Sequence, residues 1–140
     1  MFEIQNTKEI PLLRVNAHVF KHSKFGCTHL HLDCDSTEKA FSVAFRTIPK
    51  DHSGIAHILE HTVLCGSEKF PVRDPFFMMT RRSLSTFMNA MTYPDITAYP
   101  FATMNDKDYR NLLSVYLDAA FFPNIDELDF MQEGHRFELI

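Results

Sequence analysis

A short apolar segment that holds two histidines and a glutamate constrains this chain more than any other feature. Residues 57–61 read His-Ile-Leu-Glu-His, and they lie between Ser53 and Gly66. Serine is a favoured first residue of a helix, and glycine is a favoured residue just past its end. The sequence therefore predicts one short helix between these two positions. Residues four apart share a helix face, so both histidines are expected on one face, with the glutamate beside it.

This residue pattern favours metal chemistry. Two imidazoles at positions i and i+4 can chelate one zinc ion, and a neighbouring carboxylate can take a proton from zinc-bound water. The order His-x-x-Glu-His is the inverse of the His-Glu-x-x-His zinc motif. A chance occurrence is the alternative. It is the weaker interpretation, because the motif lies on a capped helix among apolar residues.

The composition indicates a globular chain and excludes several function classes. Hydrophobic residues make up 45% of the 140 residues, and the formal net charge of −4 gives no support for nucleic-acid binding. No apolar run approaches the roughly 20 residues that a membrane span needs, and no signal or transit peptide is visible. Three cysteines, an odd number, favour a reducing compartment. We expect a soluble intracellular protein, cytoplasmic if bacterial and in the mitochondrial matrix if organellar.

The order of the predicted elements indicates the α+β class, with an antiparallel sheet and flanking helices in one domain over residues 1–140. Alternating residues predict a meander of three strands before the motif helix, and a hairpin after it. Pro100 is expected at an irregular or edge position of its strand. The predicted strands cover residues 13–21, 27–34, 40–48, 86–91 and 96–103. The predicted later helices cover residues 75–82, a segment from a cap at Asn105 or Asp106 to Pro123, and residues 126–136.

Two questions about metal ligands remain open at this point. His29 and His31 point to one face of a predicted strand, but we prefer a polar strand face there, because no third ligand is fixed nearby. A catalytic zinc site needs three protein ligands, and the motif supplies only two histidines. The downstream candidates are Glu127, Glu133 and Glu138, and spacing does not decide among them.

Several segments resemble the pitrilysin/insulinase class of zinc metallopeptidases. Residues 54–67 (Gly-Ile-Ala-His-Ile-Leu-Glu-His-Thr-Val-Leu-Cys-Gly-Ser) and 74–77 (Asp-Pro-Phe-Phe) carry this resemblance. Residues 83–90 and 111–123 are similar to the presequence-protease branch of that class. The resemblance extends from about residue 26 to residue 139.

The resemblance implies a role for eight residues. His57 and His61 would be the zinc ligands, and Glu60 would be the base that activates the water. Leu64, Phe76 and Phe77 would form the apolar pocket for the side chain before the scissile bond. Asn89 and Ala90 would lie on the edge strand to which an extended peptide adds.

Family members enclose unfolded peptides, including cleaved targeting peptides, between two halves that close like a clamshell. In the presequence-protease branch the third ligand is a glutamate beyond the segment similar to residues 132–135. The resemblance therefore implies that Glu133 is not this ligand, and that the ligand and the second half lie outside the 140 residues. We expect the N-terminal portion of a zinc endopeptidase, inactive by itself. The alternative is a truncated fragment that binds a peptide or a partner half without hydrolysis.

Overall fold

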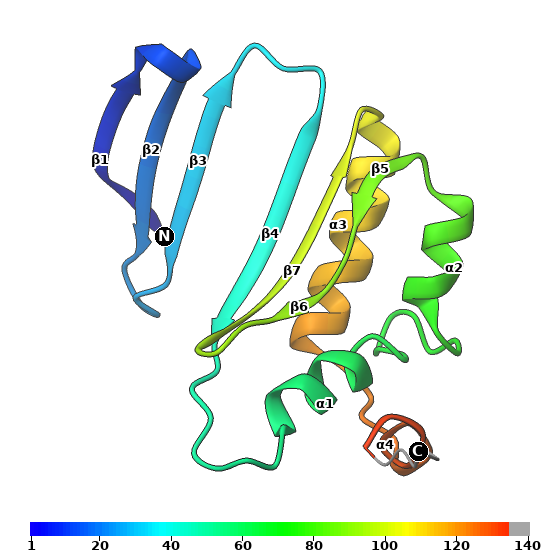
Figure 1. The fold of residues 1–140 in the computed structure, drawn as a ribbon. Helices are drawn as coiled ribbons and strands as arrows, with labels where there is room; N and C mark the ends of the chain where they lie inside the picture. Colours follow the sequence, from blue (N-terminus) through cyan, green and yellow to red (C-terminus); the bar gives the residue numbers. More distant parts are fainter. Residues whose placement is uncertain (135–140) are drawn as a thin grey trace. The chain divides into compact units, whose positions relative to one another are not determined.

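The computed structural model describes residues 1–134, and the chain divides into two compact units, residues 1–37 and 38–140 (Figure 1). Each unit contains an antiparallel sheet, and the helices longer than a single turn all belong to the second unit. The predicted α+β class is thereby confirmed. Within residues 1–134, no helix has the length and apolar character that crossing a membrane requires.

The first unit is a three-stranded antiparallel sheet in the order β1-β2-β3. Its strands are β1 (Phe2–Ile10), β2 (Val15–His22) and β3 (Thr28–Cys34). The sequence predicts β2 and β3 to within two residues but does not predict β1. Residues 5–9 are all polar, so no alternation of apolar and polar residues marks this strand. A register shift between Ile4 and Asn6 also interrupts the pairing of β1 with β2.

The sheet of the second unit is built around β7 (Ile96–Thr103). The strands β4 (Lys39–Arg46), β5 (Ser85–Met88) and β6 (Met91–Thr92) all pair with β7 in antiparallel fashion. The hairpin expected around residues 92–95 is confirmed, because β6 pairs with β7. The expected partner of β4 is wrong, because this third strand of the predicted meander pairs instead with β7. Aromatic contacts between the two strands accompany this pairing, such as Phe41 with Phe101 at 5.4 Å between ring centroids.

Pro100 lies in a central strand, and the irregularity that it causes appears in its neighbour. The Pro100 carbonyl accepts a hydrogen bond from the Asn89 backbone N–H (3.1 Å). In an antiparallel ladder, the N–H and C=O groups of one residue point to the same neighbouring strand. Proline has no N–H to donate there. The neighbouring strand is accordingly interrupted between β5 and β6, at residues 89–90.

Within residues 1–134, the second unit contains four α-helices: α1 (Ile55–Thr62), α2 (Pro75–Arg82), α3 (Asp106–Phe121) and α4 (Glu127–Glu133). Each predicted helix is present, and the final two residues of the last prediction, 135 and 136, lie outside the described residues. The side chain of Asn105 caps α3 by accepting hydrogen bonds from two backbone N–H groups, both at 3.0 Å. Leu112 and Tyr116 of α3 are fully buried and pack with Phe101 of β7 in the core.

The ends of the motif helix α1 differ from the prediction. Ser53 does not cap it, because the Ser53 hydroxyl donates to Asp51 (2.5 Å). Gly54 precedes the helix with φ 70°, and its carbonyl accepts the N–H groups of His57 and Ile58. Val63 follows the last helical residue. Gly66 lies beyond the helix, where a Cβ would be 3.2 Å from a side-chain atom of Asn124. Gly66 therefore allows close packing against Asn124 and does not end the helix.

Candidate functional site

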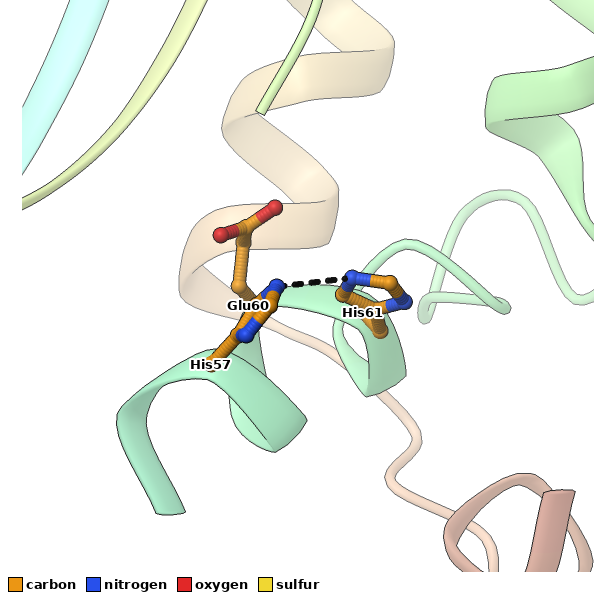
Figure 2. Close-up of side chains that lie close together, drawn as sticks. All are labelled: His57, Glu60 and His61. Atoms are coloured by element: carbon orange, nitrogen blue, oxygen red, sulfur yellow. Dashed lines mark hydrogen bonds between the residues drawn. The ribbon is translucent and has the colours of Figure 1, made fainter. Parts of the chain in front are cut away.

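The two motif histidines lie on one face of α1, and their side chains converge. The Nε2 atoms of His57 and His61 are 3.2 Å apart (Figure 2). Two nitrogens that bind one zinc ion at about 2.1 Å with a tetrahedral angle lie about 3.4 Å apart. The observed separation therefore fits a shared metal ion. Both rings are exposed, so a metal ion can reach them from solvent.

The Glu60 carboxylate lies beside the two imidazoles (Figure 2) and is nearly buried, with 6% of the residue exposed. Its Oε2 accepts a hydrogen bond from the Thr92 hydroxyl of β6 at 2.5 Å. One carboxylate oxygen of Glu60 and one ring nitrogen of each histidine lie within 4.8 Å of one another. Within residues 1–134, this is the one group of three or more His, Cys, Asp or Glu residues whose atoms converge in this way.

Glu133 of α4 contacts the other side of the His61 ring. Its Oε2 is 2.8 Å from Nδ1 of His61, the nitrogen that faces away from His57. Burial alone would raise the pKa of Glu133, but hydrogen bonds from Gln132 and His61 outweigh it and lower this pKa. The carboxylate thus orients the His61 ring so that Nε2 faces His57. Local spacing does not predict this contact, because 72 residues separate the two side chains.

A pocket of about 510 Å³ opens over the motif helix. All eight residues singled out in the sequence line it: His57, Glu60, His61, Leu64, Phe76, Phe77, Asn89 and Ala90. The helices α1 and α2 contribute one part of the wall, and the segment from residue 89 to residue 93 contributes another. Thr92 and Glu133 also line the pocket. The sequence named Glu133 only as a candidate third ligand and did not predict its hydrogen bond to His61, and it did not single out Thr92.

Two further groups near the site remain protonated at neutral pH. Burial raises the pKa of Tyr99 to about 12, and the nearby Glu60 carboxylate adds to this effect. Burial also raises the pKa of the Cys65 thiol to about 12, and the negative charges of Asp129 and Asp74 contribute to this rise. Cys65 is therefore a small buried side chain in this pocket and not a nucleophile.

The strand histidines considered as an alternative metal site lie in the first unit. His29 and His31 are both exposed on β3, and their rings stack at a centroid distance of 6.5 Å. Neither belongs to the converging group on α1. Of the glutamates considered as a third ligand, Glu133 contacts His61, and Glu138 lies outside the described residues.

Paired histidines with a buried carboxylate, in a pocket beside the terminal strand of a sheet, form the kind of arrangement that a metal-dependent hydrolase needs. The sequence profile of the family Insulinase (Peptidase family M16) matches residues 46–138. The chain belongs to this family.

Curated relatives from several organisms match nearly the whole chain. A protein of Candida albicans named "Presequence protease, mitochondrial" is 56% identical over 138 residues, which is 98% of this chain and 13% of the relative. The Mus musculus protein of the same name is also 56% identical, over 137 residues, with the same shares covered. The chain thus spans about one eighth of the length of these curated relatives.

Solved structures show the same fold. The crystal structure of pitrilysin matches 94% of this chain and 14% of its own chain, with a TM-score of 0.76 and 21% identity. A protease from Helicobacter pylori matches 84% of this chain and 28% of its own, with a TM-score of 0.71 and 21% identity. Both matches support the pitrilysin-like α+β fold predicted from the sequence.

Proposed function

We propose that this chain is the metal-binding N-terminal part of a zinc endopeptidase that degrades short unfolded peptides, such as cleaved targeting peptides. The observation that supports it best is the convergence of His57, Glu60 and His61 in one pocket. The relatives named presequence protease support the substrate class, and their mitochondrial names support a location in the mitochondrial matrix. The rest of such an enzyme would supply the third ligand and the second half.

The chain's own residues take complementary roles in this proposal. His57 and His61 would hold zinc through their Nε2 atoms, while Glu133 keeps a proton on Nδ1 of His61. The bound ion would polarise the peptide carbonyl and lower the pKa of a water molecule. Glu60 would take the proton from the attacking water and pass it to the departing amine.

The pocket also offers a place for an extended peptide. The strand β5 ends its sheet, and the exposed residue Asn89 follows it at the interruption opposite Pro100. A peptide that adds its backbone there would lie beside the motif helix. Phe76, Phe77 and Leu64 would receive an apolar side chain of this peptide. Hydrogen bonds to the backbone would accept many sequences, which suits the degradation of varied peptides.

The test uses an enzyme in which these 140 residues precede the remaining length of the Candida albicans relative, called here the completed enzyme. We expect zinc-dependent cleavage of an unstructured peptide, measured by mass spectrometry. Glu60→Gln should lower kcat by about 10²–10⁴, the usual contribution of a general base, and should retain zinc. The matched control is Glu68→Gln, because Glu68 is exposed and does not line the pocket. Equal activity in Glu60→Gln and the unchanged enzyme would contradict the proposal.

A second candidate function is peptide binding without hydrolysis. The observation that favours it is that the converging group contains two histidines and Glu60, without a third ligand among residues 1–134. Fluorescence anisotropy with a labelled unstructured peptide would measure binding to the 140-residue chain. Peptide binding combined with no turnover by the completed enzyme would establish this second function and exclude the first.

A further inference from the structure

We propose that Thr92 is a positioning residue that holds the Glu60 carboxylate as a base and prevents it from becoming a metal ligand. This inference rests on the proposed function. The Thr92 hydroxyl donates to Oε2 of Glu60 at 2.5 Å, and both residues line the same pocket. Thr92 lies on β6, so a strand of the sheet restrains a side chain of the motif helix.

Two more threonines extend this contact into the sheet. The hydroxyls of Thr92 and Thr97 are 3.4 Å apart across the paired strands β6 and β7. The Thr97 hydroxyl is also 2.8 Å from that of Thr47, which follows β4. Thr97 is buried, with 3% of the residue exposed. Thr97 on β7 and Thr47, the residue after β4, thus support the β6 hydroxyl that reaches Glu60.

The direction of these hydrogen bonds follows from the number of protons. An ionised carboxylate only accepts hydrogen bonds, and each threonine hydroxyl donates once. The Thr92 hydroxyl therefore donates its one hydrogen bond to Glu60 and can only accept a hydrogen bond from Thr97. Thr97 must in turn accept from Thr47. A directed row of hydroxyls polarises each member toward the carboxylate and strengthens the final bond.

The restraint matters because Glu60 lies close to the metal-binding nitrogens. Its oxygen and the two imidazole nitrogens fit within 4.8 Å, and a glutamate side chain has three rotatable bonds. A small rotation can bring a free carboxylate into the position of a third ligand. A ligating carboxylate no longer accepts the proton of the attacking water. Thr92 engages Oε2, so the other oxygen of Glu60 remains available to that water.

The experiment compares four variants of the completed enzyme. Thr92→Val removes the hydroxyl at similar volume, and Thr92→Ser restores it. Thr47→Val shortens the row at its far end. Thr28→Val makes the same replacement at an exposed position of β3, outside the pocket, and is the matched control. For each variant we would measure kcat, KM and zinc affinity, and the crystal structure of the 140-residue chain would give the Glu60 conformation.

Thr92→Val should lower kcat by about 10- to 100-fold with little change in KM, which is part of the usual contribution of a general base. Zinc affinity should stay equal or rise, and the Glu60 carboxylate should leave its position. Thr92→Ser should recover kcat to within about 3-fold. Thr47→Val should give a smaller loss than Thr92→Val, and Thr28→Val should give none.

Three outcomes would overturn the inference: an unchanged kcat in Thr92→Val, a loss of zinc affinity together with activity, or no recovery in Thr92→Ser. The proposed function fails separately, when the unchanged completed enzyme shows no zinc-dependent cleavage. The Glu60 conformation in the Thr92→Val crystal still decides the positioning role in that case. A carboxylate that keeps its place without the hydroxyl would refute that role.

Discussion

His61 uses both ring nitrogens, and this double use links two distant parts of the chain. Its Nε2 faces His57 on the same helix, and its Nδ1 contacts Glu133 on α4. The first contact follows from helical spacing, which made the histidine pair visible in the sequence. The second brings together residues 72 positions apart. In the proposed metal site, side chains from two helices would together present one His61 nitrogen to the metal ion.

The histidine pair gives a prediction that separates the two candidate metal sites. The 140-residue chain should bind zinc weakly, and His57→Ala should abolish this binding, because one imidazole remains. His29→Ala should leave it unchanged, since the β3 histidines do not converge with those of α1. Isothermal titration calorimetry at constant pH measures both. Loss of zinc binding in His29→Ala would instead support a metal site at the β3 histidines.

Glu133 gives a second prediction at this scale. Glu133→Gln should weaken zinc binding by about 10- to 100-fold, the usual effect of removing a carboxylate that orients a ligating histidine. Glu127→Gln is the control, because Glu127 lies on the same helix and is exposed. Competition with a chromogenic chelator reports both affinities. Equal affinities of the two variants would show that the contact with His61 does not tune the metal site.

At the scale of elements, the sequence predicts most helices and strands but not how distant ones pair. Alternation revealed β2 and β3, and Asn105 revealed the start of α3. The partner of β4 was missed, because the residue pattern of a strand does not show which distant strand pairs with it. Residues 39–46 pair with residues 96–103. The cap of α1 was missed because the Ser53 hydroxyl donates a hydrogen bond to Asp51 instead of capping the helix. General residue preferences for cap positions do not include such a local competitor.

The residues of the candidate site also divide into those that the sequence predicts and those that it does not. Its two histidines and Glu60 are close in sequence, so helical spacing alone placed them together. The five substrate-binding positions came from the family resemblance, and the structure brings all of them to the pocket while their roles stay predictions. Thr92 and Glu133 reach the motif only through tertiary packing. No periodicity or spacing argument could have found these two contacts.

The start of α1 gives a prediction at this scale. Gly54→Ala should destabilise the chain by about 1–2 kcal/mol, because the residue has φ 70° and alanine avoids this left-handed region. A Cβ there would touch nothing within 4 Å, so the cost is conformational and not steric. Urea unfolding followed by tyrosine fluorescence measures it, since all four tyrosines lie in the second unit.

Two control variants make the result decisive. Gly54→Asn should cost less than Gly54→Ala, because asparagine tolerates the left-handed region better. Ser53→Ala should change stability by less than about 0.5 kcal/mol, since the serine does not cap α1 in the structure. A larger loss in Ser53→Ala than in Gly54→Ala would support the cap expected from the sequence.

At the scale of the whole molecule, the chain holds part of a site. Its residues supply two converging imidazoles, a buried carboxylate and the lining of a pocket, while it spans 13% of the Candida albicans relative. We predict that the 140 residues alone do not cleave an unstructured peptide at a useful rate. Two imidazoles hold zinc poorly, and each missing transition-state contact costs about 10²–10³ in rate.

Incubation of the chain with zinc and peptide, followed by mass spectrometry, measures this rate. The completed enzyme serves as the positive control in the same assay. Zinc-dependent cleavage by the 140 residues alone, lost in Glu60→Gln, would show that these residues hold a full catalytic centre.

The position of β7 also sets an order of events during synthesis on the ribosome. The strands β4, β5 and β6 all pair with β7, which comes after all three in the chain. Fifty-seven residues separate the end of β4 from the end of β7. At a synthesis rate of about 5–20 residues per second, β7 is completed roughly 3–11 seconds after β4. During this time the apolar residues Phe41, Val43 and Phe45 have no partner strand. A nascent chain stalled before residue 96 should therefore bind chaperones through β4, and release from them should follow the emergence of β7.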